Sequence, residues 1–115
     1  MVVDDNVDSA RTFSQLLQWA GCITHDVNEG AKAIDAAKTF RPDVILLDIG
    51  RPGVDGYQIA RLIRQTPELS RVRLIAVTGY DHPEHLERSR AAGFDDHLVK
   101  PVEIGYLLQR LRVTD

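Results

Sequence analysis

Along this chain, short apolar runs typical of strands alternate with segments in which apolar residues recur every three or four positions, as in helices. The chain opens on a short apolar run, Val2-Val3, which ends at an acidic pair. Apolar residues then recur at three- and four-residue steps, at Ala10, Phe13, Leu16, Leu17 and Ala20. These steps predict a helix that is capped by Asn6 or Asp8 and ends at Gly21.

The same order of strand and helix is repeated in the next segment. Residues 23–27 are apolar at both ends, Ile23 and Val27, and are predicted to form a strand. Residues 29–40 are expected to form a helix, with Asn28 as its cap. The core face of this helix is expected at Ala33, Ile34 and Ala37.

The middle of the chain carries its longest unbroken apolar run, Val44-Ile45-Leu46-Leu47. A strand that is apolar at consecutive positions must be covered on both faces, as in a parallel sheet between two layers of helices. A loop is expected over residues 49–56. Asp55 is then expected to cap a helix that ends by Thr66, because Pro67 follows.

Two more strand–helix units complete the pattern. Residues 72–78 predict a strand, and Pro83 and Gly93 bound the helix after it. Residues 94–100 predict the last strand, and residues 102–112 predict the last helix. Five such units predict an α/β fold with an open, doubly wound, five-stranded parallel sheet, because five are too few to close an eight-unit barrel.

Composition narrows the class of protein. A chain of 115 residues suits one domain, and 14 Lys plus Arg against 17 Asp plus Glu give a net charge of −3. This charge disfavours direct binding to nucleic acid. The single cysteine, Cys22, excludes an internal disulfide. No apolar run is long enough for a membrane span, so we expect a cytoplasmic domain without membrane contact of its own.

Polar residues follow four of the five predicted strands. Asp4 and Asp5 follow the first strand, Asp48 the third, Thr78 the fourth and Lys100 the fifth. Because the carboxyl ends of parallel strands meet at one edge of the sheet, we expect these side chains to converge there. Each is ordinary alone, as a helix cap, a turn residue or a strand exit, but together they form the set that phosphoryl transfer requires.

The chemistry of this set indicates a phosphoryl acceptor. Clustered carboxylates favour Mg²⁺, which keeps several waters that a phosphate oxygen can replace. Lys100 and Thr78 can stabilise charge on a transferring phosphoryl group. Asp48 is the best candidate nucleophile because it ends the most buried strand, and its attack on a phosphoryl donor would give an aspartyl phosphate.

Four motifs carry a resemblance to a known family. They are Val2-Val3-Asp4-Asp5-Asn6, Leu46-Leu47-Asp48-Ile49 with Pro52-Gly53-Val54-Asp55-Gly56, Ile75-Ala76-Val77-Thr78-Gly79, and Leu98-Val99-Lys100-Pro101. In order and position along the chain they resemble the receiver domain of two-component response regulators. The resemblance implies a flavodoxin-like sheet of strand order 2-1-3-4-5. It also implies one receiver domain over residues 1–115. Only three residues precede Asp4, fewer than a central strand usually has, so we expect a first strand that is clipped at its N-terminus and a parent chain that continues upstream.

The resemblance implies a metal-dependent reaction. A phosphoryl group would pass from a phosphohistidine to Asp48 with Mg²⁺ or Mn²⁺ as the cofactor. Asp5 would bind the metal directly and Asp4 through water, and the backbone carbonyl of Gly50 would be a further ligand. Such a domain catalyses only its own phosphorylation and dephosphorylation, although the parent chain can be a histidine kinase.

The resemblance also implies a conformational switch. Thr78 would follow the phosphate and Lys100 would pair with it, and Lys100-Pro101 is similar to the family's cis peptide. The family's aromatic switch position, three residues before the lysine, is occupied by His97. The family often has Tyr or Phe there. His97 is therefore either a switch residue whose coupling depends on pH or an ordinary surface histidine.

The implied partners are a histidine kinase or a histidine phosphotransfer protein, which would dock near the first helix and the loop between the last strand and the last helix. A weak homodimer is a further possibility. Residues 48–53 and 93–102 are most similar to receivers at the C-terminal end of hybrid sensor histidine kinases. In that context the domain would be the cytoplasmic part of a membrane-bound sensor. A stand-alone single-domain response regulator is the alternative.

Three other functions are disfavoured. Phosphatases with an aspartate nucleophile carry a second aspartate two residues later, where this chain has Gly50. A flavin or nucleotide carrier would have a glycine-rich phosphate loop after the first strand, where Asp4-Asp5-Asn6 would repel a phosphate. A degenerate receiver would lack part of the site, whereas all of its residues are present.

Overall fold

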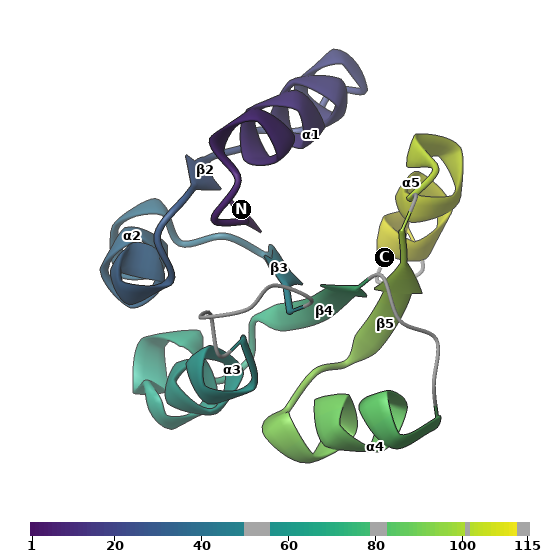
Figure 1. Ribbon diagram of the computed structural model, residues 1–115. Helices are drawn as coiled ribbons and strands as arrows, with labels where there is room; N and C mark the ends of the chain where they lie inside the picture. The colour runs from purple at the N-terminus through teal and green to yellow at the C-terminus, as the bar shows by residue number, and fades with distance from the viewer. Residues whose placement is uncertain (50–55, 79–82, 101, 113–115) are drawn as a thin grey trace.

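The computed structural model describes residues 1–49, 56–78, 83–100 and 102–112. Five parallel strands form one sheet in the order β2-β1-β3-β4-β5 (Figure 1). The strands are β1 (Val2–Val3), β2 (Asp26–Val27), β3 (Val44–Asp48), β4 (Arg73–Thr78) and β5 (Asp96–Val99). The helices are α1 (Val7–Trp19), α2 (Ala33–Phe40), α3 (Gly56–Gln65), α4 (Pro83–Ala92) and α5 (Ile104–Arg112), with short 3₁₀ helices η1 (Gly30–Lys32) and η2 (Pro67–Leu69). The predicted α/β class and strand order are confirmed.

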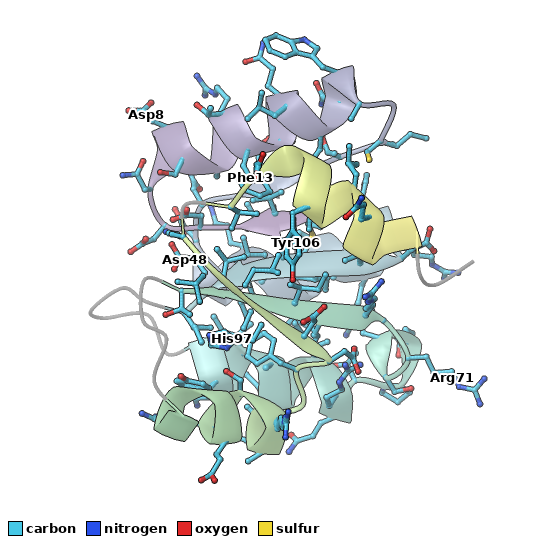
Figure 2. All side chains as sticks on the ribbon, turned by 90° about the vertical axis from the view of Figure 1, so that its right-hand side faces the viewer. Asp8, Phe13, Asp48, Arg71, His97 and Tyr106 are labelled. Atoms are coloured by element: carbon cyan, nitrogen blue, oxygen red, sulfur yellow. The ribbon has the colours of Figure 1, made fainter. Side chains whose placement is uncertain are left out.

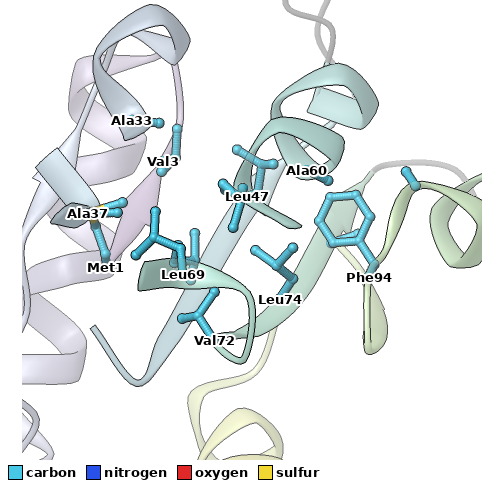
Figure 3. Packing of buried hydrophobic residues seen from close by; sticks show 14 of the residues in the cluster. Met1, Val3, Ala33, Ala37, Leu47, Ala60, Leu69, Val72, Leu74 and Phe94 are labelled. Carbon is cyan, nitrogen blue, oxygen red and sulfur yellow. The ribbon is translucent and has the colours of Figure 1, made fainter. Parts of the chain in front are cut away.

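Helices cover both faces of the sheet. Helices α1 and α5 lie on one face and α2, α3 and α4 on the other (Figure 1). Strand β3 supplies Ile45 and Leu47 to the core under α2 and α3, and it supplies Leu46 to the core under α1 and α5. Figure 3 shows Leu47 packed in the first of these cores. The unbroken apolar run is therefore buried on both sides, as predicted.

The two strands nearest the N-terminus are short. Strand β2 pairs with β1 only through Val2 with Asp26 and Val3 with Val27. The prediction of a strand over residues 23–27 was too long, and Ile23 is 89% exposed. Among the described residues, β2 has β1 as its one neighbour in the sheet, and its pairing is limited because β1 offers two residues.

The structure shows which of the predicted cap residues lie at helix ends. Asn6 caps α1, because its side-chain oxygen accepts a hydrogen bond from the backbone N–H of Ser9 at 3.0 Å. The helix ends before Gly21, whose φ of 98° suits a residue without a Cβ. The prediction of Asn28 as a helix cap was wrong, because the 3₁₀ turn η1 stands between it and α2. The predicted cap Asp55 lies outside the described residues.

One arginine joins α3 to both connections that lead into β4 and β5. Arg64 donates through Nε to the carbonyl of Gly93 at 2.9 Å and through Nη1 to the carbonyl of Val72 at 2.6 Å. Its Nη1 also contacts the carbonyl of Ser70, and its Nη2 donates to Asp95 Oδ2 at 2.7 Å. These bonds fix α3 at the end of the sheet that lies away from the predicted site.

A helix needs about 20 consecutive apolar residues to cross a bilayer. Across the described part of the chain, no helix is long and apolar enough to do so.

Candidate functional site

The predicted site residues converge on one edge of the sheet. Asp48 is the last residue of β3 and Thr78 the last residue of β4. Asp4 directly follows β1, and Lys100 directly follows β5. All strands are parallel, so these four positions lie at the same carboxyl-terminal edge. Residues separated by up to 96 positions in the chain are therefore neighbours only because of the fold.

An ion pair joins two of these residues. The ammonium Nζ of Lys100 lies 2.7 Å from Oδ2 of Asp48, although the two residues are 52 positions apart in the chain. The Asp48 side chain is 4% exposed, whereas the Lys100 side chain is 38% exposed. A buried carboxylate is costly without a compensating charge, and this charge-assisted hydrogen bond supplies one.

Asp4 and Thr78 are buried beside this edge. Asp4 is 7% exposed, and its Oδ1 accepts a hydrogen bond from the backbone N–H of Asn6 at 3.0 Å. Thr78 is almost completely buried at the end of β4, which lies between β3 and β5. Asp5, the next residue after Asp4, is exposed to solvent. Asp4 is thus held by the start of α1, and Asp5 is presented outward.

A cleft of about 610 Å³ opens beside the ion pair. Asp4, Asp48 and Lys100 line it together with residues of α1 and of the sheet floor. Figure 2 shows Asp48 and Asp8 at the same end of the molecule, with Phe13 farther along α1. The carboxylates therefore face a space that a small phosphorylated group can enter.

The donors at this edge fit a magnesium ion. Proteins commonly hold Mg²⁺ through one or two carboxylates, with water and phosphate oxygens as the other ligands, and Asp4 and Asp48 line the same cleft. Within the described ranges, no group of three or more acidic, histidine or cysteine side chains has the arrangement of a fuller metal site. The predicted ligand Gly50 lies outside those ranges, as does Pro101 of the predicted cis peptide.

His97 makes a contact that the sequence did not suggest. Its Nδ1 lies 3.2 Å from the hydroxyl oxygen of Ser89, which is 2% exposed on α4. Its Nε2 is buried and has no hydrogen-bond partner in the part of the chain that the structure describes. Ser89 was missed, but the small residues Ser89 and Ala92, three apart in a polar helix, were a signal for the face of α4 that packs on the sheet.

This fold and site define a class of signalling domain, in which a doubly wound α/β sheet presents a buried aspartate paired with a lysine. The family model of the response regulator receiver domain matches residues 1–112. The chain is 30% identical to the polar-differentiation response regulator DivK of Brucella anthropi over 112 residues, which are 97% of this chain and 91% of that protein. The chain belongs to the response regulator receiver domain family, whose members are phospho-acceptors of two-component systems.

Solved structures agree with this assignment. The chemotaxis protein CheY4 of Vibrio cholerae superposes with a TM-score of 0.90 at 28% identity, covering 97% of this chain and 93% of that one. The receiver domain of a signal transduction histidine kinase from Syntrophus aciditrophicus gives a TM-score of 0.84 at 28% identity, covering 97% and 85% of the two chains. Receiver domains interact with histidine kinases or phosphotransfer proteins and generally depend on Mg²⁺.

Proposed function

We propose that this receiver domain accepts a phosphoryl group on Asp48. The observation that carries the proposal is the 2.7 Å ion pair between Asp48 and Lys100 at the carboxyl-terminal edge of the sheet. A buried carboxylate at the end of a central strand, beside an ammonium and a cleft, is a fixed nucleophile next to a charge that stabilises the product.

The transfer is a displacement at phosphorus. A carboxylate oxygen of Asp48 forms the new O–P bond while the N–P bond of a phosphohistidine breaks, and the imidazole nitrogen leaves with the bonding electrons and takes up a proton. The ammonium of Lys100, which pairs with Asp48, would follow the charge onto the transferred group. Thr78, at the end of the neighbouring strand β4, would donate its hydroxyl to a phosphoryl oxygen. Mg²⁺ or Mn²⁺, when bound, would neutralise the phosphoryl charge.

The metal is assigned to the acidic side of the cleft. Asp4, Asp5 and Asp48 would hold it, with the backbone carbonyl of Gly50 as a further ligand. The burial of Asp4 and the exposure of Asp5 support a division of roles, in which Asp5 reaches the hydrated ion and Asp4 acts through water.

Phosphorylation is proposed to move α4 through His97. A phosphoryl group on Asp48 would attract Thr78, which is paired in register with Val99 on β5. His97 stands two residues before Val99 and contacts Ser89 on α4. A shift of β4 toward the phosphate would therefore change the packing of this histidine and the position of α4.

The donor is proposed to be a histidine kinase or a histidine phosphotransfer protein that docks at the mouth of the cleft near α1. The likeness to a histidine-kinase receiver from Syntrophus aciditrophicus supports a hybrid sensor kinase as the parent protein. The likeness to DivK and CheY4 favours a stand-alone response regulator as the alternative. The reading frame upstream of Met1 decides between them, because a kinase core there would establish the hybrid arrangement.

We expect the domain to work in the cytoplasm and not to bind nucleic acid itself. Any homodimer would be weak. Sedimentation of the phosphorylated and unphosphorylated domain measures this oligomeric state directly.

Labelling by acetyl phosphate tests the proposed acceptor. The wild-type domain should become labelled in the presence of Mg²⁺ and should stay unlabelled when the metal is chelated. Asp48→Asn should abolish labelling and keep the circular dichroism spectrum. Asp26→Asn, at an exposed position on β2, is the matched control and should label normally. Labelling of Asp48→Asn at the wild-type level would reject the assignment.

A further inference from the structure

The cleft extends well beyond the residues that phosphoryl transfer uses. Its lining runs along α1 from Asp8 to Leu16, a length of about 12 Å at the helical rise. Its volume of about 610 Å³ falls within the usual range of small-molecule sites, roughly 300–1,000 Å³. The phosphoacceptor occupies only one end of this space, so most of the cleft has no role in the proposed reaction.

The interior of the cleft is apolar. Phe13 and Leu16 of α1 form one wall, Leu46 and Val77 form the floor on β3 and β4, and Val102 closes the side before α5. Leu46 and Val77 belong to the hydrophobic core under α1 and α5, and Phe13 and Val102 pack against it. An apolar group that enters the cleft therefore leaves water and meets carbon atoms on several sides.

The mouth of the cleft is polar and carries net negative charge. Asp4, Asp8 and Asp48 bring three carboxylates to the lining, and Lys100 is the single cation among the lining residues in the described ranges. Because α1 begins three residues after Asp4, Asp8 in its first turn stands at the same end of the sheet as Asp48 (Figure 2). In the metal-free protein, this charge balance favours a cationic group over an anionic one.

We propose that this cleft binds a small amphipathic primary amine, with its hydrocarbon tail between Phe13 and Leu46 and its ammonium group at the acidic mouth. The polarity of the cleft and the charge of its mouth select this class of ligand over fatty acids and over neutral hydrocarbons. The amine would also compete with the divalent ion at Asp4 and Asp48, a consequence that rests on the proposed function. The cleft would then be a site at which a cationic metabolite restrains phosphorylation.

Binding of hexylammonium, measured by calorimetry and by chemical shifts in metal-free protein, tests the site independently of any reaction. Along the series butyl-, pentyl- and hexylammonium, each added methylene should tighten binding about fourfold, the factor expected for one buried CH₂. Hexanoate, with a similar tail and the opposite charge, should bind at least tenfold more weakly than hexylammonium. Equal binding of the two, or no dependence on chain length, would overturn the proposal.

Matched variants locate the ligand. Thr12→Phe places a ring in the cleft and should weaken hexylammonium binding at least tenfold, whereas Gln15→Phe on the outer surface of α1 should not. Asp8→Asn should weaken binding of hexylammonium and leave binding of hexanol unchanged. Equal effects of the two Phe variants would refute the location. A dimer that only Thr12→Phe dissociates would instead show that a second copy of the chain covers the cleft, and would also overturn the proposal.

The link to phosphorylation has a separate readout. Mg²⁺ should weaken hexylammonium binding, and hexylammonium should slow labelling by acetyl phosphate, less so in Thr12→Phe. If Mg²⁺ does not change the affinity for hexylammonium, the two do not compete, although the cleft would still bind amines. Binding in a domain that acetyl phosphate never labels would contradict the proposed function and leave the site intact.

Discussion

Replacement of Arg64 should reveal how strongly α3 is fixed to the sheet. Its guanidinium makes four hydrogen bonds, three to the backbone carbonyls of Ser70, Val72 and Gly93 and one to Asp95. A hydrogen bond contributes about 1 kcal/mol net, and more when one partner is charged. The bonds to Val72 and Gly93 are partly buried, while the bonds to Ser70 and Asp95 are exposed and count for less.

The sum gives an expected loss of about 3 kcal/mol in the free energy of unfolding for Arg64→Ala, or roughly 10–15 °C in Tm for a domain of this size. Arg64→Lys should recover only part of the loss, since one ammonium nitrogen cannot span the acceptors that Nε, Nη1 and Nη2 of the guanidinium reach. Asp95→Asn should cost less than about 1 kcal/mol, because its ion pair with Arg64 is solvent-exposed.

The assay is urea unfolding followed by circular dichroism, since Trp19 is 75% exposed and reports little on the core. Arg61→Ala, at an exposed position on the same helix, is the matched control and should stay within about 0.5 kcal/mol of wild type. Labelling of the folded fraction by acetyl phosphate should be unchanged in Arg64→Ala. The reasoning is refuted if Arg64→Ala costs under 1 kcal/mol, or if Asp95→Asn costs as much as Arg64→Ala.

Two further predictions follow from charged groups. Burial lowers the pKa of the Met1 amine from 8.0 to about 6, and nearby Cys22 and Asp43 oppose the shift. The unfolded chain therefore binds more protons between these values, so stability should rise by about 2 kcal/mol from pH 6 to pH 8. Urea unfolding of N-acetylated protein should lack this rise. Lys100→Met leaves the Asp48 carboxylate without its ammonium partner and should destabilise the metal-free domain by about 1–3 kcal/mol and slow labelling. Unchanged unfolding and labelling in that variant would contradict the role of the ion pair.

The sheet and its edge were predictable because they depend on patterns within single segments. The run Val44-Ile45-Leu46-Leu47 can be satisfied only by a strand covered on both faces, and the structure places it there. The polar residues at the ends of four strands then meet at one edge of the sheet, which is why the convergence of Asp48 and Lys100, 52 residues apart, could be anticipated.

The features that were missed depend on partners far away in the sequence. The pattern of residues 23–27 is that of a strand, but the length of β2 is set by the two residues that β1 offers. The acceptors of Arg64 are mostly backbone carbonyls, which no side-chain pattern identifies, and Gly93 lies 29 residues away from it. The cleft along α1 likewise results from how helices and sheet pack, which spacing within one helix does not determine.

Chemical trapping of the phosphorylated residue tests the central claim most directly. Borohydride reduces an aspartyl phosphate to homoserine, and peptide mass spectrometry then identifies the position of the change. After treatment with acetyl phosphate and Mg²⁺, we expect homoserine at position 48 and unmodified aspartate at positions 4 and 5. Homoserine at either of those positions with Asp48 unchanged, or phosphate found on a histidine or a hydroxyl side chain, would contradict it.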